Sequence, residues 1–224
     1  MRRGFNAMQN GVFDEWLKQK ALKQQIAEME ATVRQGEAAS RENAFLRDLL
    51  DLRQQRRDLS DFETATVTER SVTNWTSSLT LDKGSAHGVE VGDCVIDGAG
   101  ALVGRVSRVG YNWSTVLTVV DTDTSLGARV YRTQDIGIAA GDFALMGDGL
   151  LKLDSLPASA QLLEGDLVVT SGFGGYIPPD LVIGSVTELR AEDSDTTVYA
   201  VLTPAADLAS LTEVCIIKSF EVVN

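Results

Sequence analysis

The sequence predicts a mainly β protein in which a long N-terminal α-helix precedes two small antiparallel β-barrels. Three observations predict this class. Helix-forming residues with heptad spacing fill about the first sixty positions, short β-branched runs separated by turn residues fill the rest, and part of that rest is repeated. Glycine follows the same division, since 3 of the 20 glycines precede residue 64 and 17 follow it. Two kinds of structure therefore meet near residue 60.

The segment 13–59 is predicted to form a single helix. It contains no proline, one glycine (Gly36) and a high density of Ala, Leu, Glu, Gln, Lys and Arg, which all have high helix propensity. Such a helix would be roughly 70 Å long. A lone helix of that length cannot bury its apolar residues, so we expect residues 13–61 to pair as a coiled coil.

The apolar residues of this segment have heptad spacing in two pieces, typical of a left-handed parallel dimer. The pieces are out of register, because Val33 and Phe45 are 12 residues apart, and we expect the coil to be interrupted between them. A helix that lies on the globular part is the alternative left open. The residues expected at the dimer seam are Leu22, Ile26, Met29, Val33, Phe45, Leu49 and Leu52.

After residue 61 the period of the pattern changes to two. Short runs rich in β-branched residues are separated by Gly, Asp or Asn, which is typical of an antiparallel sandwich or barrel. No long helical pattern interrupts these runs, so a parallel βαβ architecture is not expected. The runs expected to form strands are 64–68, 79–81, 101–109, 115–120, 126–131, 181–189, 197–203 and 214–217.

An internal repeat lies inside this region. Segments 91–95 and 102–109 are echoed by segments 164–168 and 182–189. Gly-Asp before a strand is a tight-turn device, and glycine inside a strand marks a bend or a close backbone approach. The repeat predicts two barrels of related design. The glycines expected at turns and corners are Gly84, Gly88, Gly92, Gly104, Gly165, Gly172 and Gly184.

Candidate catalytic and metal-binding groups are few. His87 is the only histidine, and with two distant cysteines (Cys94 and Cys215) it cannot make a typical zinc site. Residues 121–125 begin like a calcium loop but lack its glycine and its bidentate glutamate. Residues 171–175 are glycine-rich but precede no Lys-Ser/Thr. We predict no catalytic residues, no metal and no cofactor, and hence a protein that is not an enzyme.

The charge distribution argues against nucleic-acid binding. Residues 1–63 hold 11 Lys and Arg against 11 Asp and Glu, and residues 64–224 hold 9 against 21. The second part therefore carries the whole net charge of −12. Neutralising phosphates requires clustered Lys and Arg, which this chain lacks.

The order of the motifs from about residue 21 to residue 217 resembles the bacterial rod shape-determining MreC family. Single motifs are weak signals, but their order and spacing over about 170 residues are specific. One departure is Asp180, which stands where the family usually has glycine. The segments that carry the resemblance are 42–43, 46–50, 75, 79–84, 88–92, 102–106, 168–175, 183–184 and 204–214.

The resemblance implies two six-stranded barrels with the topology of trypsin-type proteases but without their catalysis. It also implies a single-pass membrane anchor just upstream of the coil, for which the given sequence holds no long enough apolar run, and an extracytoplasmic location on the bacterial inner membrane. We accordingly expect a juxtamembrane remainder over 1–12, the helix over 13–61, a first barrel over 62–123 and a second over 124–224. The last strand closes the second barrel or returns to the first.

The implied function is a non-enzymatic scaffold of cell elongation that maintains rod shape. The implied partners are a second copy, MreD, MreB and a penicillin-binding transpeptidase. Self-association through the barrels is also implied, and exposed edge strands are natural surfaces for it. Trp75 and Tyr176 are expected near barrel surfaces. Two other hypotheses are a periplasmic adaptor of an efflux or secretion system and a barrel hydrolase that uses His87.

Overall fold

The computed structural model describes residues 2–220 apart from 57, 74–75, 158–159 and 192–197, with the backbone alone for 2–19, 21, 60, 191 and 198. The chain divides into two compact units, residues 1–44 (the arm) and 45–224 (the body). The elements are α1 (Arg2–Gln55), β1 (Leu59–Val72), β2 (Ser77–Leu81), η1 (Ser85–His87), β3 (Cys94–Ile96), β4 (Leu102–Val109), β5 (Ser114–Thr118), β6 (Ser125–Val130), β7 (Ile136–Gly141), α2 (Phe143–Met146), β8 (Leu151–Asp154), β9 (Leu167–Thr170), β10 (Val182–Ala191), β11 (Val198–Pro204) and β12 (Glu213–Phe220).

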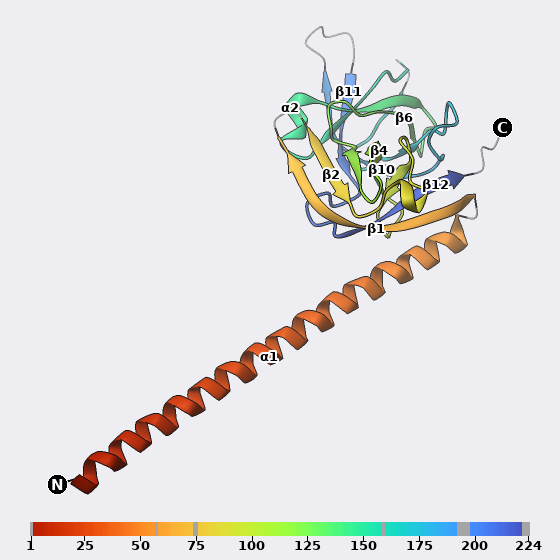
Figure 1. Ribbon diagram of the computed structural model, residues 1–224. Coiled ribbons are helices and arrows are strands. Elements are labelled where there is room, and N and C mark those ends of the chain that lie inside the picture. Colours follow the sequence, from red (N-terminus) through yellow and green to blue (C-terminus); the bar gives the residue numbers. More distant parts are fainter. Residues whose placement is uncertain (1, 57, 74–75, 158–159, 192–197, 221–224) are drawn as a thin grey trace. The chain divides into compact units, whose positions relative to one another are not determined.

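The strands form two closed six-stranded antiparallel barrels (Figure 1). Barrel 1 has the order β1-β12-β3-β4-β5-β2, and barrel 2 has the order β10-β11-β8-β7-β6-β9. The predicted fold class of a helix followed by two such barrels is confirmed. β12 pairs with β1 and β3, so the last strand returns to the first barrel.

Two strands, β7 and β8, were not among the runs expected from the sequence, whereas β3 and β9 follow the two Gly-Asp turns of the repeat. β7 is Ile-Gly-Ile-Ala-Ala-Gly, a segment too poor in β-branched residues to stand out, and β8 is only four residues long. Each is held by neighbours on both sides. The expectation of exposed edge strands was wrong, because a closed barrel pairs every strand twice.

The two barrels share one hydrophobic core. Leu102 and Val120 of the first barrel belong to the same buried cluster as Leu151 and Ile183 of the second, and all four are no more than 3% exposed. A separate buried cluster fills the rest of barrel 1. The shared cluster makes the two barrels a single packed body.

The sequence repeat corresponds to the same turn in both barrels. Gly92 and Gly165 have positive φ angles of 105° and 86°, which glycine adopts without strain. The side chains of Asp93 and Asp166 each accept a hydrogen bond of 2.8 Å from the backbone N–H three residues earlier. Each turn leads directly into a strand of its barrel, β3 in barrel 1, where it pairs with β4, and β9 in barrel 2, where it pairs with β10.

A second repeated feature is a close backbone approach inside β4 and β10. A Cβ atom on Gly104 would lie 2.0 Å from the carbonyl oxygen of Leu117, and one on Gly184 would lie 2.1 Å from that of Thr203. Backbone rather than a movable side chain occupies the space in both cases. Glycine at these two positions allows the strands to cross closely.

The two repeated aspartates differ in their electrostatics. Arg132 pairs with Asp166 through two hydrogen bonds of 2.6 and 2.7 Å, and this pairing lowers the pKa of Asp166. Asp93 has no such arginine partner among the described side chains, and burial raises its pKa. The two copies of the repeat therefore have the same turn, but only the second copy has an arginine paired with its aspartate.

Gly104→Ala is expected to destabilise the body by about 3 kcal/mol, because the new methyl group overlaps a carbonyl oxygen that cannot move without breaking the sheet. The measurement is urea unfolding followed by circular dichroism. Gly147→Ala is the matched control, since a Cβ there meets no described atom within 4 Å. Equal midpoints for the two variants would contradict the close approach.

Asp166→Asn is expected to cost about 2 kcal/mol at pH 7, because it removes a charge-assisted pair with Arg132. The folded-state pKa of Asp166 is lowered, so this stability is present above the pKa of the unfolded chain and is lost as the pH falls through the folded value. The difference between wild type and variant should shrink below about pH 4. Asp93→Asn is the control and should cost little at pH 7. A constant difference across pH would exclude the ionised pair.

Candidate interaction surface

The arm exposes the first piece of the heptad pattern. Leu22, Ile26, Met29 and Val33 are 51–68% exposed, although they are large apolar side chains. A shallow, almost wholly apolar groove follows three of them along the helix. Solvent-exposed apolar side chains at heptad spacing are what a partner helix would cover.

The second piece lies against the body. Phe45, Leu49 and Leu52 are half-buried and pack on the core that the two barrels share. The β3–β4 turn is built to receive them, since a Cβ on Gly98 would lie 2.9 Å from Phe45 and one on Gly100 would lie 2.8 Å from Leu52. For this part of the helix, the structure has the arrangement that the sequence left open, a helix lying on the globular part.

The remaining predicted glycines also lie at turns or close approaches. Gly88 and Gly172 have positive φ angles. A Cβ on Gly84 would lie 2.4 Å from the carbonyl oxygen of Gly110, where the loop after β2 meets the β4–β5 hairpin. These positions shape loops and contribute no reactive group.

The loop between β9 and β10, residues 171–181, presents two aromatic side chains to solvent. Phe173 is 68% exposed and Tyr176 is 79% exposed. Tyr176 thus lies at the surface, as expected, whereas Trp75 lies outside the described residues. We call residues 171–181 the aromatic loop.

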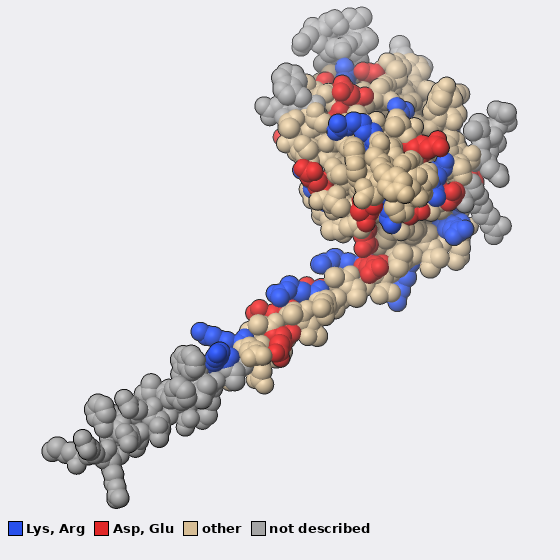
Figure 2. Space-filling model, in the orientation of Figure 1, with Lys and Arg blue, Asp and Glu red and all other residues tan. Residues whose placement is uncertain are grey.

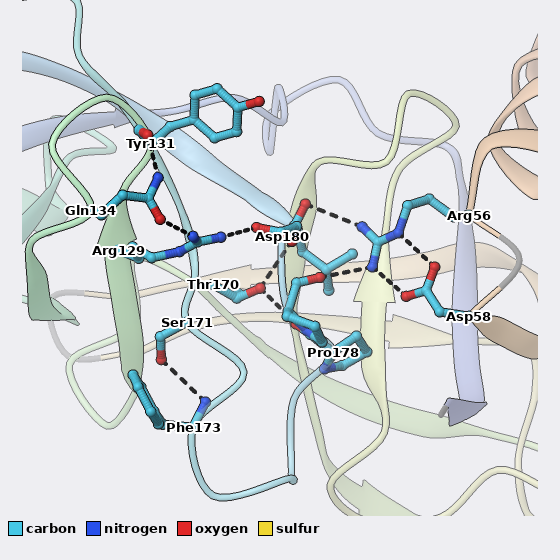
Figure 3. A network of polar contacts seen from close by, with 12 residues as sticks. Arg56, Asp58, Arg129, Tyr131, Gln134, Thr170, Ser171, Phe173, Pro178 and Asp180 are labelled. Carbon is cyan, nitrogen blue, oxygen red and sulfur yellow. Dashed lines mark hydrogen bonds and ion pairs between the residues drawn. The ribbon is translucent and has the colours of Figure 1, made fainter. Parts of the chain in front are cut away.

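The base of the aromatic loop is fixed by Thr170, which is fully buried. Its hydroxyl donates to the carbonyl oxygen of Pro178 at 2.6 Å and accepts from the N–H of Leu181 at 2.9 Å (Figure 3). The N–H of Asp180 donates to the Thr170 carbonyl at 3.0 Å. One threonine therefore holds both the peptide group of Pro178 and the end of the loop.

Arg56, the residue after α1, connects the start of β1 to this loop. Its guanidinium donates to both carboxylate oxygens of Asp58, at 2.9 and 2.7 Å. It also donates to the carbonyl oxygens of Pro179 at 2.7 Å and Asp180 at 3.1 Å (Figure 3). The pairing lowers the pKa of Asp58. Because α1 leads into barrel 1 and the loop belongs to barrel 2, Arg56 joins the two.

Asp180 has a left-handed backbone with φ of 61°, a conformation that glycine adopts without strain. Its carboxylate pairs with Arg129 of β6, and Arg129 also donates to Gln134 (Figure 3). The aspartate thus makes an ion pair that glycine could not make.

Where the barrels meet, a groove of about 490 Å³ opens, lined among others by Leu79, Met146 and Leu208. Arg70 crosses it and donates to the carbonyl oxygen of Leu208. The lining is mostly apolar and carries one carboxylate, Asp207, whose pKa is lowered chiefly by Ser210. On the face in Figure 2, acidic and basic side chains of the body are interspersed.

The described histidine and cysteines are not placed as catalytic groups usually are. The Nδ1 atom of His87 is buried without a hydrogen-bond partner, whereas a Ser-His-Asp triad needs an acid at this atom. Burial raises the pKa of both Cys94 and Cys215 to about 12, so neither thiol is reactive. Among the described residues, no three His, Cys, Asp or Glu side chains gather as metal ligands.

Residues 67–218 match the family model of the rod shape-determining protein MreC, barrel core. The chain belongs to the MreC family. The cell shape-determining protein MreC of Listeria monocytogenes is 30% identical over 200 residues, which cover 88% of this chain and 66% of that protein. The chain therefore spans less than two thirds of the length of this relative.

Solved MreC structures have the same fold. One is 27% identical with a TM-score of 0.71, covering 80% of this chain and 99% of that structure. A major periplasmic domain of "the cell shape-determining filament MreC" is 25% identical with a TM-score of 0.59, covering 70% and 94%. MreC from Helicobacter pylori, solved in complex with the penicillin-binding protein PBP2, is 19% identical with a TM-score of 0.54, covering 71% and 99%, and supports the fold alone.

These findings confirm the expected MreC resemblance and its barrels. MreC proteins are named for cell shape rather than for a reaction. In the part of the chain that is described, no helix combines the length and the apolar character that crossing a membrane requires.

Arg56→Ala is expected to destabilise the body by about 2 kcal/mol and to loosen the aromatic loop, since it leaves Asp58 unpaired and two carbonyl groups without their donor. Hydrogen exchange at the amide of Asp180 measures the loop directly. Arg53→Ala, in the same helical turn and exposed, is the control and should change neither quantity. Unchanged exchange in Arg56→Ala would show that Thr170 holds the loop by itself.

Proposed function

We propose that the protein is a non-enzymatic scaffold of the bacterial cell-elongation machinery, which organises peptidoglycan synthesis and maintains rod shape. The observation that carries this proposal is the match of the barrel core, residues 67–218, to the rod shape-determining family. The chemistry of the body supports it, since its thiols are buried and unreactive and its histidine lacks an acid partner at Nδ1. The body is therefore proposed to act by binding partners at its surface.

A penicillin-binding transpeptidase is the first proposed partner. The Helicobacter pylori relative was solved in complex with PBP2, and the aromatic loop of this chain supports a similar role. Exposed aromatic side chains on a fixed backbone are effective contacts, because little conformational entropy is lost on binding. Phe173 and Tyr176 are exposed, and the loop that carries them is anchored at its C-terminal end, because Thr170 and Arg56 bond to Pro178 and Pro179. MreD and MreB are further proposed partners.

A second copy of the chain is the other proposed partner, bound along the arm. Leu22, Ile26, Met29 and Val33 are exposed at heptad spacing, and burying them between two helices would stabilise a helix that is otherwise solvated. Self-association through the barrels, in keeping with the relative described as a filament, would use side-chain surfaces, because both barrels are closed.

The barrels are proposed to lie on the extracytoplasmic face of the cytoplasmic membrane. The solved relative that is described as a major periplasmic domain matches 70% of this chain. A periplasmic adaptor is less well supported, because the single long helix α1 precedes every described strand, whereas adaptors usually insert a helical hairpin within a β-domain.

Ile26→Asp is expected to round the cells when it replaces the native residue in the source bacterium, since a charge at the seam opposes pairing of the arm. Ala27→Asp, the adjacent position off the seam and also exposed, is the control and should leave rods intact. The measurements are cell width by microscopy and sedimentation of the purified chains. Rods in a strain depleted of the protein would overturn the scaffold function, and a dimeric Ile26→Asp would overturn the role of the arm.

A further inference from the structure

The groove where the two barrels meet is lined by segments of both. It brings together the end of β1, the start of β2, the end of β5, residues 146–149 after β7 and residues 203–209 at the end of β11. Its volume of about 490 Å³ is within the range of small-molecule sites. The groove therefore has the size of a ligand site, and a molecule bound in it contacts both barrels.

The lining of the groove is mostly apolar. Leu79, Val120 and Met146 are buried, so the apolar lining reaches the packed interior of the body. Val72 is largely exposed and Leu208 is half-buried, so the lining continues to the surface. An apolar chain laid along these side chains loses its contact with water, which favours binding.

Most hydroxyl groups of the lining are already bonded. Thr118 donates to the hydroxyl of Ser77 at 2.8 Å, and the hydroxyl of Thr203 lies 2.6 Å from that of Thr187. A ligand rich in polar groups, such as a sugar or an extended peptide, would give up its bonds to water for a lining that offers few free hydroxyls, and this exchange opposes binding. The lining therefore favours a ligand with few polar groups.

Arg70 supplies the one positive charge of the described lining. Its guanidinium donates to the carbonyl oxygen of Leu208, and it makes no ion pair within the described part of the chain. The carboxylate of Asp207 is bonded within its own turn, to the N–H of Ala209 at 3.2 Å and to the hydroxyl of Ser210 at 2.6 Å. The pKa of Asp207 is accordingly lowered chiefly by Ser210 and least by the charge of Arg70. The guanidinium thus keeps N–H donors for the carboxylate of a ligand.

We propose that the groove binds an amphipathic carboxylate, whose apolar chain lies along the lining while Arg70 binds its carboxylate. A straight-chain fatty acid is the simplest molecule of this class. The groove includes no residue of the arm or of the aromatic loop, so this site is separate from the partner contacts proposed above. Because both barrels line the groove, the bound ligand stabilises the folded body, and its melting temperature rises with ligand concentration.

Titration calorimetry of the purified 224-residue chain tests the site with decanoate, 1-decanol and hexanoate. Decanoate has both the chain and the charge, 1-decanol has the chain alone, and hexanoate has the charge on a shorter chain. Decanoate is expected to saturate a single site and to bind at least about tenfold more tightly than either of the others. Absence of saturable decanoate binding, or equal affinities for decanoate and 1-decanol, overturns the proposal.

Arg70→Gln removes the charge and is expected to weaken decanoate binding at least about tenfold while leaving 1-decanol binding unchanged. Wild-type affinity for decanoate in this variant overturns the proposal. Arg108→Gln, which is exposed on β4 and outside the lining, is the matched control and should bind decanoate as the wild type does.

Gly147→Trp tests the groove without changing Arg70. A Cβ on Gly147 meets no described atom within 4 Å, and its backbone is right-handed with φ of −60°, so a larger side chain fits there without strain. The indole ring fills part of the groove and is expected to weaken both decanoate and 1-decanol at least about tenfold. Undiminished binding of both ligands to this variant overturns the groove as their site.

The methyl signals of two methionines in an NMR spectrum locate the bound ligand. Met146 lines the groove between the barrels, whereas Met29 lines the apolar groove of the arm, so the two report on different surfaces in one sample. With decanoate, the Met146 signal is expected to shift and the Met29 signal to stay. A shift at Met29 without one at Met146 shows that the ligand covers the arm instead, and overturns the proposal.

Discussion

The pairing of β1 with β12 is the constraint on which the rest of the body depends. β1 follows the helix directly, and β12 is the last strand, so their ladder from Leu59 to Thr66 joins the two ends of the body. All the strands of barrel 2 lie between β5 and β12 in the sequence, so barrel 1 is closed by a strand that follows the whole of barrel 2. Such non-local pairing is entropically expensive, and the core that both barrels share offsets this cost.

The same constraint fixes where the helix enters. Because β1 begins at Leu59, a buried residue of the shared core, the last turns of α1 are carried onto the β3–β4 turn, where Gly98 and Gly100 leave room for them. Arg56 then reaches the aromatic loop of barrel 2. The helix end, barrel 1 and the exposed aromatics thus form one mechanically connected assembly. A scaffold requires this property, because binding at one surface must hold the other surfaces in place.

The repeated turns illustrate how much a sequence pattern conveys. Gly92-Asp93 and Gly165-Asp166 could be assigned as turns from residue type, and Gly104 and Gly184 as close approaches, because these roles depend on backbone geometry that few residues tolerate. Their charge environments could not be predicted. Whether an aspartate meets an arginine depends on Arg132, which is 34 residues before Asp166 in the chain and is brought beside it by folding.

The amino-acid sequence by itself determined the helix, the two-barrel class, the repeated turns and the family, since these follow from periodicity, residue propensity and the order of local motifs. Only the tertiary structure decided which barrel receives the last strand, because the four consecutive buried residues of β12, 214–217, would suit the interior of either barrel. The tertiary structure also decided that Phe45, Leu49 and Leu52 pack on the core of the body. Heptad spacing gives the helix an apolar face whether a second helix or the body covers that face. Only the position of the β3–β4 turn determines that the chain's own barrel covers it.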